Sequence, residues 1–203
     1  MSLSTWVCRV GKPVVFVACL VPFSLLVTDL FQGRLGANPI EEITHRTGDW
    51  ILVFLFITLG ITPLRRLTRW GVLIRFRRML GLFAFFYAVA HFSTYVVFDH
   101  FFDLAAIVED IVERPYVTVG FTSLVLLIPL AVTSTKGWVK RLGGRRWNRL
   151  HQLIYVSAVG GVLHYLWLVK ADTREPQRWA IAVALLIGFR LWWMNRARLS
   201  WRS

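Results

Sequence analysis

The lengths of the apolar runs constrain the fold of this chain more than any other feature. Six runs, at about residues 14–31, 47–64, 79–98, 116–132, 150–169 and 178–194, approach the ~20 residues with which an α-helix crosses a bilayer. Because backbone groups find no water in lipid, each run must be a helix that satisfies its own hydrogen bonds. Hydrophobic residues make up 56% of the chain, too large a share for a soluble domain. We therefore predict an all-α membrane protein, a bundle of six transmembrane helices that forms a single domain over residues 1–203.

The basic side chains indicate how this bundle is oriented. The formal net charge of +13 by itself suggests nucleic-acid binding. The basic residues, however, concentrate on the side of the predicted bundle that holds the N-terminus: Arg9, Lys12, the clusters in 65–78 and 136–149, and Arg190, Arg196, Arg198 and Arg202. All eleven Asp and Glu fall on the opposite side. Since Lys and Arg concentrate in cytoplasmic loops, this alternation predicts that both termini are cytoplasmic, and it argues against a nucleic-acid partner.

One of the outer loops is expected to be helical. Within residues 103–113, apolar side chains recur at helical spacing, namely Leu104, Ile107, Val108, Ile111 and Val112. The acidic residues lie off this stripe. The pattern predicts a short amphipathic helix on the outer membrane face. Its acidic edge is either a solvated face or a surface that receives a partner protein.

Two histidines lie inside apolar runs, where an ionisable group is costly and therefore a functional candidate. At a rise of ~1.5 Å per residue, His91 lies about 18 Å and His164 about 21 Å from the cytoplasmic ends of their helices. The two imidazoles could therefore face each other at one level and ligate a haem iron. The alternative is a buried, hydrogen-bonded histidine on each helix. Gly81, Gly160 and Gly161 either make room for a flat macrocycle or pack helices together.

The other three histidines are less clearly placed. His151 stands at the cytoplasmic entrance to the fifth run, ~20 Å from His164 along an ideal helix. It is either a ligand of a second haem or a neighbour of a flavin or a haem propionate, since Arg77 and Arg78 occupy the matching depth on the third run. His45, expected in the first outer loop, and His100, at the outer end of the third run, are either solvated or cofactor contacts.

No other catalytic pattern is present in the sequence. We find no phosphate-binding Walker loop, no dinucleotide-binding glycine motif, no paired-histidine zinc motif and no nucleophile elbow. A nicotinamide-binding domain has no room in the chain. Electrons would therefore have to come from a separate molecule.

Several stretches in the same order resemble the MsrQ family, also called YedZ, which belongs to the ferric-reductase-like transmembrane group. They are NPIEEITHRTGDW (38–50), ITPLRRL (61–67), RRMLGLFAFFYAVAHFSTY (77–95), ERPYVTVGF (113–121), LAVTSTKG (130–137), RRWNRLHQLIYV (145–156) and LHYLWLVKAD (163–172). This resemblance implies b-type haem (one or two), FMN, and a place in the bacterial inner membrane. It also implies a role as an electron-transfer subunit. Electrons would pass from the quinone pool or a cytosolic flavin reductase to a periplasmic molybdopterin methionine sulfoxide reductase (MsrP) that repairs oxidised proteins.

The family's histidine positions carry over to His91, His151 and His164 of this sequence. Wider relatives carry two histidines on each of two helices, whereas Arg77 or Arg78 stands here in place of the fourth. The phosphate of FMN or a haem propionate would suit the basic inner loops, with Arg77, Arg78, Arg145 and Arg146 as candidates; solvated topology charges are the alternative for each. Two other functions stay open on the residues alone: a self-contained ferric or metal reductase, and a non-redox transporter or scaffold.

Overall fold

The computed structural model describes residues 3–199, with the side chains of residues 5–7 and 9–196, and every element in that part of the chain is helical. The charges predicted for Arg198 and Arg202 lie outside the described side chains. The α-helices are α1 (Leu3–Trp6), α2 (Lys12–Phe31), α3 (Pro39–Thr68), α4 (Ile74–Thr94), α5 (Leu104–Glu113), α6 (Pro115–Val132), α7 (Lys136–Leu150), α8 (Leu153–Leu168) and α9 (Arg174–Leu199). Two π-helical turns (Val7–Gly11 and Tyr95–Asp99) and a 3-10 turn (Gly71–Leu73) adjoin α2 and α4. The all-α class is confirmed.

Four helical stretches of the described chain are long and apolar enough to cross a bilayer: Arg9–Phe31, Pro39–Thr68, Gly71–Asp99 and Pro115–Val132. The last two predicted spans correspond to α8, which has only 16 residues, and to α9, which has 26 residues and charges at both ends. The chain is thus a multi-pass membrane protein, and the count of six spans stays a prediction.

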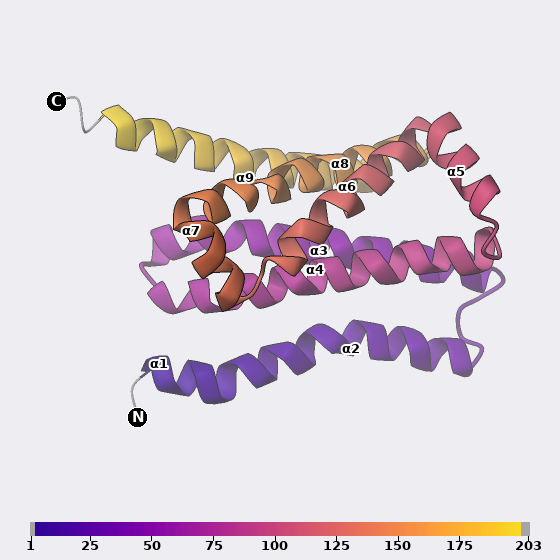
Figure 1. Cartoon of the computed structure of the whole chain (residues 1–203). Helices are drawn as coiled ribbons and strands as arrows, with labels where there is room; N and C mark the ends of the chain where they lie inside the picture. Colours follow the sequence, from indigo (N-terminus) through magenta and orange to yellow (C-terminus); the bar gives the residue numbers. More distant parts are fainter. Residues whose placement is uncertain (1–2, 200–203) are drawn as a thin grey trace.

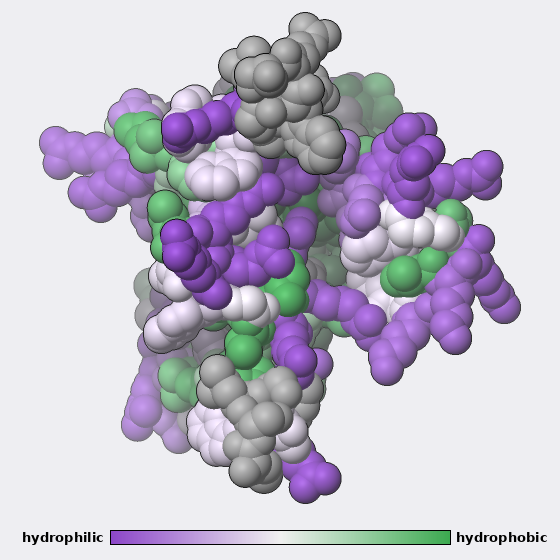
Figure 2. Space-filling model, turned by 90° about the vertical axis from the view of Figure 1, so that its left-hand side faces the viewer, coloured by the Kyte–Doolittle hydropathy of each residue, from purple (hydrophilic) through white to green (hydrophobic). Residues whose placement is uncertain are grey.

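The long helices lie side by side, with α2 on one side of the α3–α4 pair and α6, α8 and α9 on the other (Figure 1). The start of α2 and the end of α9 lie at the same end of the bundle, together with α7 and the α3–α4 connection. We call this the basic end; Figure 2 looks onto it and shows hydrophilic side chains over much of it. The α2–α3 connection, α5 and the α8–α9 connection lie at the opposite end, which we call the acidic end.

α3 begins much earlier than the predicted span at residue 47. Asn38 caps the helix by accepting a hydrogen bond from the backbone N–H of Glu41 at 3.4 Å, and Pro39 stands at its first position, where no N–H is needed. His45 is therefore helical, and its predicted place in a loop was wrong. Arg46, one residue further on, pairs with Asp29 and Glu42 at 2.7 Å each and ties α2 to α3 at the acidic end.

The segment predicted as the second inner loop is largely helical. It forms α7, which is capped by Thr135 and kinked at Gly143, where φ is 71°. Apolar periodicity failed to indicate this helix because its sequence is mostly basic. Trp147 holds it to the bundle by donating a hydrogen bond from Nε1 to the carbonyl oxygen of Thr133 at 2.9 Å.

Pro22 makes possible the hydrogen-bonded contact between α2 and α4. A proline inside a helix opens the local hydrogen-bond ladder, and the hydroxyl of Tyr87 enters the opening. It donates to the carbonyl oxygen of Cys19 at 3.0 Å and accepts from the N–H of Phe23 at 3.1 Å. Tyr87 is wholly buried and stacks on Phe54 of α3, so this one side chain joins three helices.

α5 has the predicted amphipathic character. Ile107 is buried, whereas Leu104, Val108 and Val112 are exposed by 60% or more. Asp110 anchors the helix to the end of α4, because it accepts from the Tyr95 hydroxyl at 3.0 Å and lies 3.4 Å from Nε2 of His100. This contact gives His100 a structural role at the acidic end.

Candidate functional site

The structure brings the rings of His91 of α4 and His164 of α8 next to each other in an edge-on arrangement. Their ring centres are 6.3 Å apart and the ring planes stand at 85° to each other. Sequence depth alone predicted that the two would share a level, and the packing of α4 and α8 against α3 and α6 turns them toward each other. No group of three or more His, Cys, Asp or Glu that could hold a metal occurs among the described residues, so the pair stands without a third such ligand.

Each ring of this pair is fixed by a hydrogen bond from its Nδ1 atom. Nδ1 of His91 lies 3.0 Å from the carbonyl oxygen of Thr44 and 3.3 Å from the hydroxyl of Thr47. Nδ1 of His164 lies 2.7 Å from the carbonyl oxygen of Tyr116. Because a carbonyl oxygen only accepts, each Nδ1 carries the proton and each Nε2 presents a lone pair. A backbone carbonyl behind the ring is the usual partner of a metal-binding histidine.

The spacing of the rings can be tested against haem ligation. Two imidazoles bound to one metal through nitrogen–metal bonds of roughly 2.0 Å have ring centres about 6 Å apart. The 6.3 Å found here agrees with that geometry, and the free Nε2 lone pairs are the required donors. His91 and His164 therefore fit a haem iron and are the residues that would hold it.

A glycine on a neighbouring helix stands behind each of the two histidines. A Cβ atom at Gly120 of α6 would lie 2.7 Å from Nδ1 of His164, closer than such atoms approach. A Cβ atom at Gly48 of α3 would lie 3.4 Å from Cε1 of His91. Sequence analysis missed both glycines. The signal that could have found them is a glycine at the same depth on the helix before each histidine.

The glycines that the sequence did single out pack helices together. A Cβ atom at Gly160 would lie 2.2 Å from the hydroxyl of Ser123, so α8 and α6 approach closely there. Cβ atoms at Gly161 and Gly81 would make ordinary contacts of 3.6 Å with Leu52 and Thr58 on α3. Of the two interpretations left open, these contacts support helix packing.

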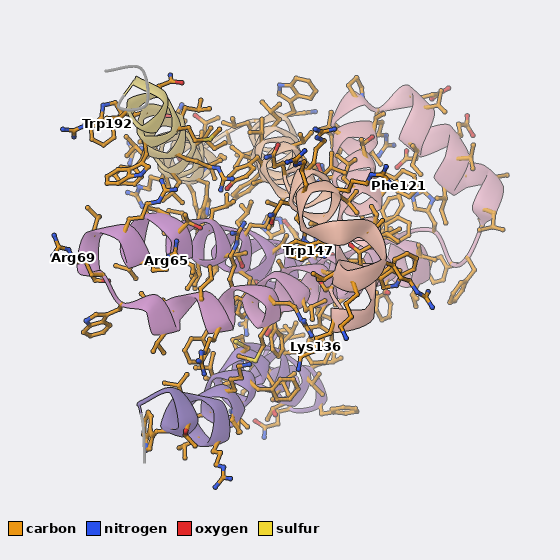
Figure 3. All side chains as sticks on the ribbon, turned by 60° about the vertical axis from the view of Figure 1, so that its left-hand side comes forward. Arg65, Arg69, Phe121, Lys136, Trp147 and Trp192 are labelled. Carbon is orange, nitrogen blue, oxygen red and sulfur yellow. The ribbon has the colours of Figure 1, made fainter. Side chains whose placement is uncertain are left out.

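His151 lies at the basic end, between α7 and α8. Its ring stacks on Trp147 with the ring centres 3.8 Å apart, and its Nε2 atom lies 3.0 Å from the hydroxyl of Thr133. That hydroxyl is 2.6 Å from the carbonyl oxygen of Pro129, to which it donates, so Nε2 of His151 is the donor to Thr133. In this arrangement the lone pair of His151 is on Nδ1. Trp147 lies on α7 where this helix crosses the basic end (Figure 3).

The remaining histidines are separate from this pair. His45 is exposed on the first turns of α3, 4.0 Å from Glu41, and His100 contacts Asp110 as described above. The four candidate arginines are also dispersed. Arg77 is partly buried within the bundle, whereas Arg78, Arg145 and Arg146 are exposed.

Comparison with known proteins agrees with this architecture. Residues 46–162 match the family described as ferric reductase like transmembrane component. A protein of Herminiimonas arsenicoxydans is 56% identical over 189 residues, which cover 92% of this chain and 87% of that protein. A protein of Rhodospirillum rubrum is 51% identical over 195 residues, or 96% of this chain and 94% of that protein. Both are named protein-methionine-sulfoxide reductase heme-binding subunit MsrQ.

The chain belongs to the MsrQ family. Family membership confirms the resemblance drawn from the sequence motifs, and it places the chain within the ferric reductase-like transmembrane group. The family match spans His91 and His151, and His164 lies two residues beyond its end. No solved structure matches the chain.

Proposed function

We propose that this protein carries electrons across the membrane as the haem-binding subunit of a protein-methionine-sulfoxide reductase system. The observation that carries the proposal is the adjacent pair of His91 and His164, each with Nδ1 hydrogen-bonded to a carbonyl oxygen, which leaves the lone pair on Nε2. The names of its relatives, which describe haem-binding subunits of such a reductase, support it. A bound b-type haem supplies a one-electron carrier.

The chain's own residues would hold that carrier in place. His91 and His164 would hold the haem iron. The carbonyl oxygens of Thr44 and Tyr116 would keep both rings in the tautomer that donates a lone pair. Gly48 and Gly120 would let the two rings sit against their neighbouring helices. We assign no step of proton transfer to the pair, because both Nδ1 protons are committed to these carbonyl oxygens.

The proposed topology is a single domain of six spans with both termini in the cytoplasm of a bacterial inner membrane. It is supported by the segregation of charge, since the acidic residues of the chain fall at the end opposite to the arginine-rich connections. Electrons would enter at the basic end from the quinone pool or a cytosolic flavin reductase, with FMN as a further cofactor. They would leave at the acidic end to a periplasmic molybdopterin methionine sulfoxide reductase.

The proposal is tested on the detergent-purified chain by a dithionite-reduced minus oxidised spectrum, with a pyridine haemochrome assay for stoichiometry. We expect the sharp α-band of b-type haem, and faster haem reoxidation when the purified molybdoenzyme and methionine sulfoxide are added. A haem band without that acceleration would favour a self-contained metal reductase. Protein purified without haem from cells that make haem would favour a non-redox transporter or scaffold.

His151 is proposed to act in the delivery of electrons from the inner side. Replacing His151 with Ala should leave the haem of His91 and His164 bound, because the ring stacks on Trp147 and does not contact the pair. It should slow reduction of that haem by the inner donor, measured by stopped-flow absorbance. The exposed His45→Ala variant is the control. A fall in haem per chain would assign His151 to a second haem, and an unchanged rate would contradict its role in delivery.

A further inference from the structure

Three arginines from different helices converge inside the basic end of the bundle. Arg190 of α9 donates a hydrogen bond to the hydroxyl of Tyr155 on α8, and its guanidinium lies 4.6 Å from the centre of that ring. Arg77 of α4 lies close to the same hydroxyl and 3.5 Å from that of Thr62. Arg66 of α3 is near enough to Arg190 for the two charges to repel each other. The group is thus a cluster of like charges around one phenol.

No Asp or Glu side chain lies in the half of the molecule that holds this cluster. All eleven Asp and Glu lie within residues 29–49, 99–113 and 172–175, which belong to the acidic half of the molecule. Uncompensated charge is costly away from water, and ionisable residues within a membrane protein are functional candidates by default. Arginines that only orient a membrane protein lie in water-exposed loops, so the preference of Lys and Arg for cytoplasmic loops does not account for these three.

The contacts within the chain leave part of the cluster unsatisfied. Arg66 lies over the ring of Trp193, 5.1 Å from its centre, yet its NH1 nitrogen is buried and has no hydrogen-bond partner. A narrow cleft opens at the same place, lined by Thr62, Pro63, Arg66, Tyr155, Phe189 and Arg190. Figure 3 shows the surrounding end of the bundle, with Arg65 on α3, Arg69 just after it and Trp192 on α9. Arg66 and Arg190 therefore line a cleft that contains no carboxylate, and Arg77 lies next to it through Thr62.

We propose that Arg66, Arg77 and Arg190, with the Tyr155 hydroxyl, form a binding site for a phosphate group. Planar guanidinium groups match phosphate oxygens in pairs and stay charged when desolvated, which makes arginine suited to this task. The apolar and aromatic walls suit a ligand whose phosphate is joined to an apolar or aromatic body. Two sources meet this description, the phosphate of FMN and the headgroup of a phospholipid. The FMN source rests on the proposed function, whereas the phosphate site does not.

This assignment includes only one of the four arginines that sequence analysis proposed as candidates for binding a phosphate or a haem propionate. Arg77 belongs to the cluster, because it reaches into the bundle beside Tyr155. Arg145 and Arg146 are exposed on α7, and Arg78 is exposed on α4. Arg66 and Arg190, which sequence analysis treated only as charges of the cytoplasmic side, belong to the proposed site instead. No spacing pattern links them, since they lie on α3 and α9, more than a hundred residues apart.

The test uses the purified full chain and two ligands that differ only in phosphate, FMN and riboflavin. Binding is followed by quenching of flavin fluorescence, and bound phospholipid is measured as phosphate in a solvent extract. We expect FMN to bind about ten- to hundredfold more tightly than riboflavin, because charged hydrogen bonds to the phosphate are missing in riboflavin. Arg190→Gln should remove this preference. Arg149→Gln, at an exposed position on α7, should keep it.

The haem spectrum reports independently whether each variant is folded. If Arg190→Gln loses that spectrum, Arg66→Gln and Tyr155→Phe provide the same test. Loss of bound phospholipid in these variants, with flavin binding unchanged, would keep the phosphate site and assign it to lipid. The proposal is overturned if neither FMN preference nor bound phospholipid depends on the cluster, or if Arg145→Gln with Arg146→Gln alone removes the FMN preference. Each of these outcomes can occur with the haem intact, so failure here is distinct from failure of the proposed function.

Discussion

Replacing either His91 or His164 with Ala should abolish the low-spin spectrum of a haem with two axial histidines. Each variant removes one of the two Nε2 donors, and the other donor on the opposite helix cannot substitute for it, since the ring centres are 6.3 Å apart. The measurement is the visible spectrum of the oxidised and reduced protein, with haem content by pyridine haemochrome. His45→Ala, at an exposed position on α3, should keep the wild-type spectrum.

Added imidazole makes this prediction specific for ligation. Alanine leaves space where the ring was, so free imidazole at millimolar concentration should enter that space and restore at least part of the low-spin band. A histidine that merely stabilises the fold through its bond to Thr44 or Tyr116 would not be replaced in this way. The ligand assignment fails if either alanine variant retains the intact low-spin spectrum without imidazole.

Gly120→Ala should displace the His164 ring and so weaken or remove its bond to the haem iron. The added Cβ atom would lie 2.7 Å from Nδ1 and 3.0 Å from Cγ of the ring. The ring cannot retreat freely, because Nδ1 is held 2.7 Å from the carbonyl oxygen of Tyr116 on the same helix as Gly120. We expect loss of the low-spin band or its partial conversion to a high-spin form. Overpacking of this kind also lowers the free energy of unfolding by about 1–3 kcal/mol.

A series of glycine variants provides the controls for this effect. Gly60→Ala on α3 meets no atom within 4 Å and should behave as wild type. Gly48→Ala, with its Cβ 3.4 Å from Cε1 of His91, should have a smaller effect than Gly120→Ala. Haem spectra and thermal unfolding of the three variants test this order. A normal low-spin spectrum in Gly120→Ala would show that His164 has more room than the structure gives it.

The helices that cross the bundle could be predicted because the period and length of apolar runs depend on the sequence alone. Four of the six runs lie within one helix each, the run at 79–98 continues from α4 into a π-helical turn, and the run at 150–169 exceeds α8 at both ends. The amphipathic pattern of 103–113 became α5. Prediction failed for α7, which is rich in Lys and Arg. This helix depends on its Thr135 cap and on the bond from Trp147 to Thr133, which are contacts that hydropathy does not register. The start of α3 was missed for a similar reason, since the cap at Asn38 extends it beyond its apolar part.

By itself, the sequence determined the all-helical class and the segregation of basic and acidic residues to opposite ends of the bundle. It also determined that His91 and His164 lie at similar distances from the basic ends of their helices. These follow from residue type and the constant rise of a helix. The tertiary structure alone decided that the two rings lie next to each other and which nitrogen each presents, because the carbonyl oxygens of Thr44 and Tyr116 lie on other helices. It also decided that Gly120 and Gly48 stand behind the rings. It brought Arg66 of α3 and Arg77 of α4 each near Arg190 and Tyr155. Such contacts join residues 43 or more positions apart, and no local period of the sequence records the packing of one helix against another.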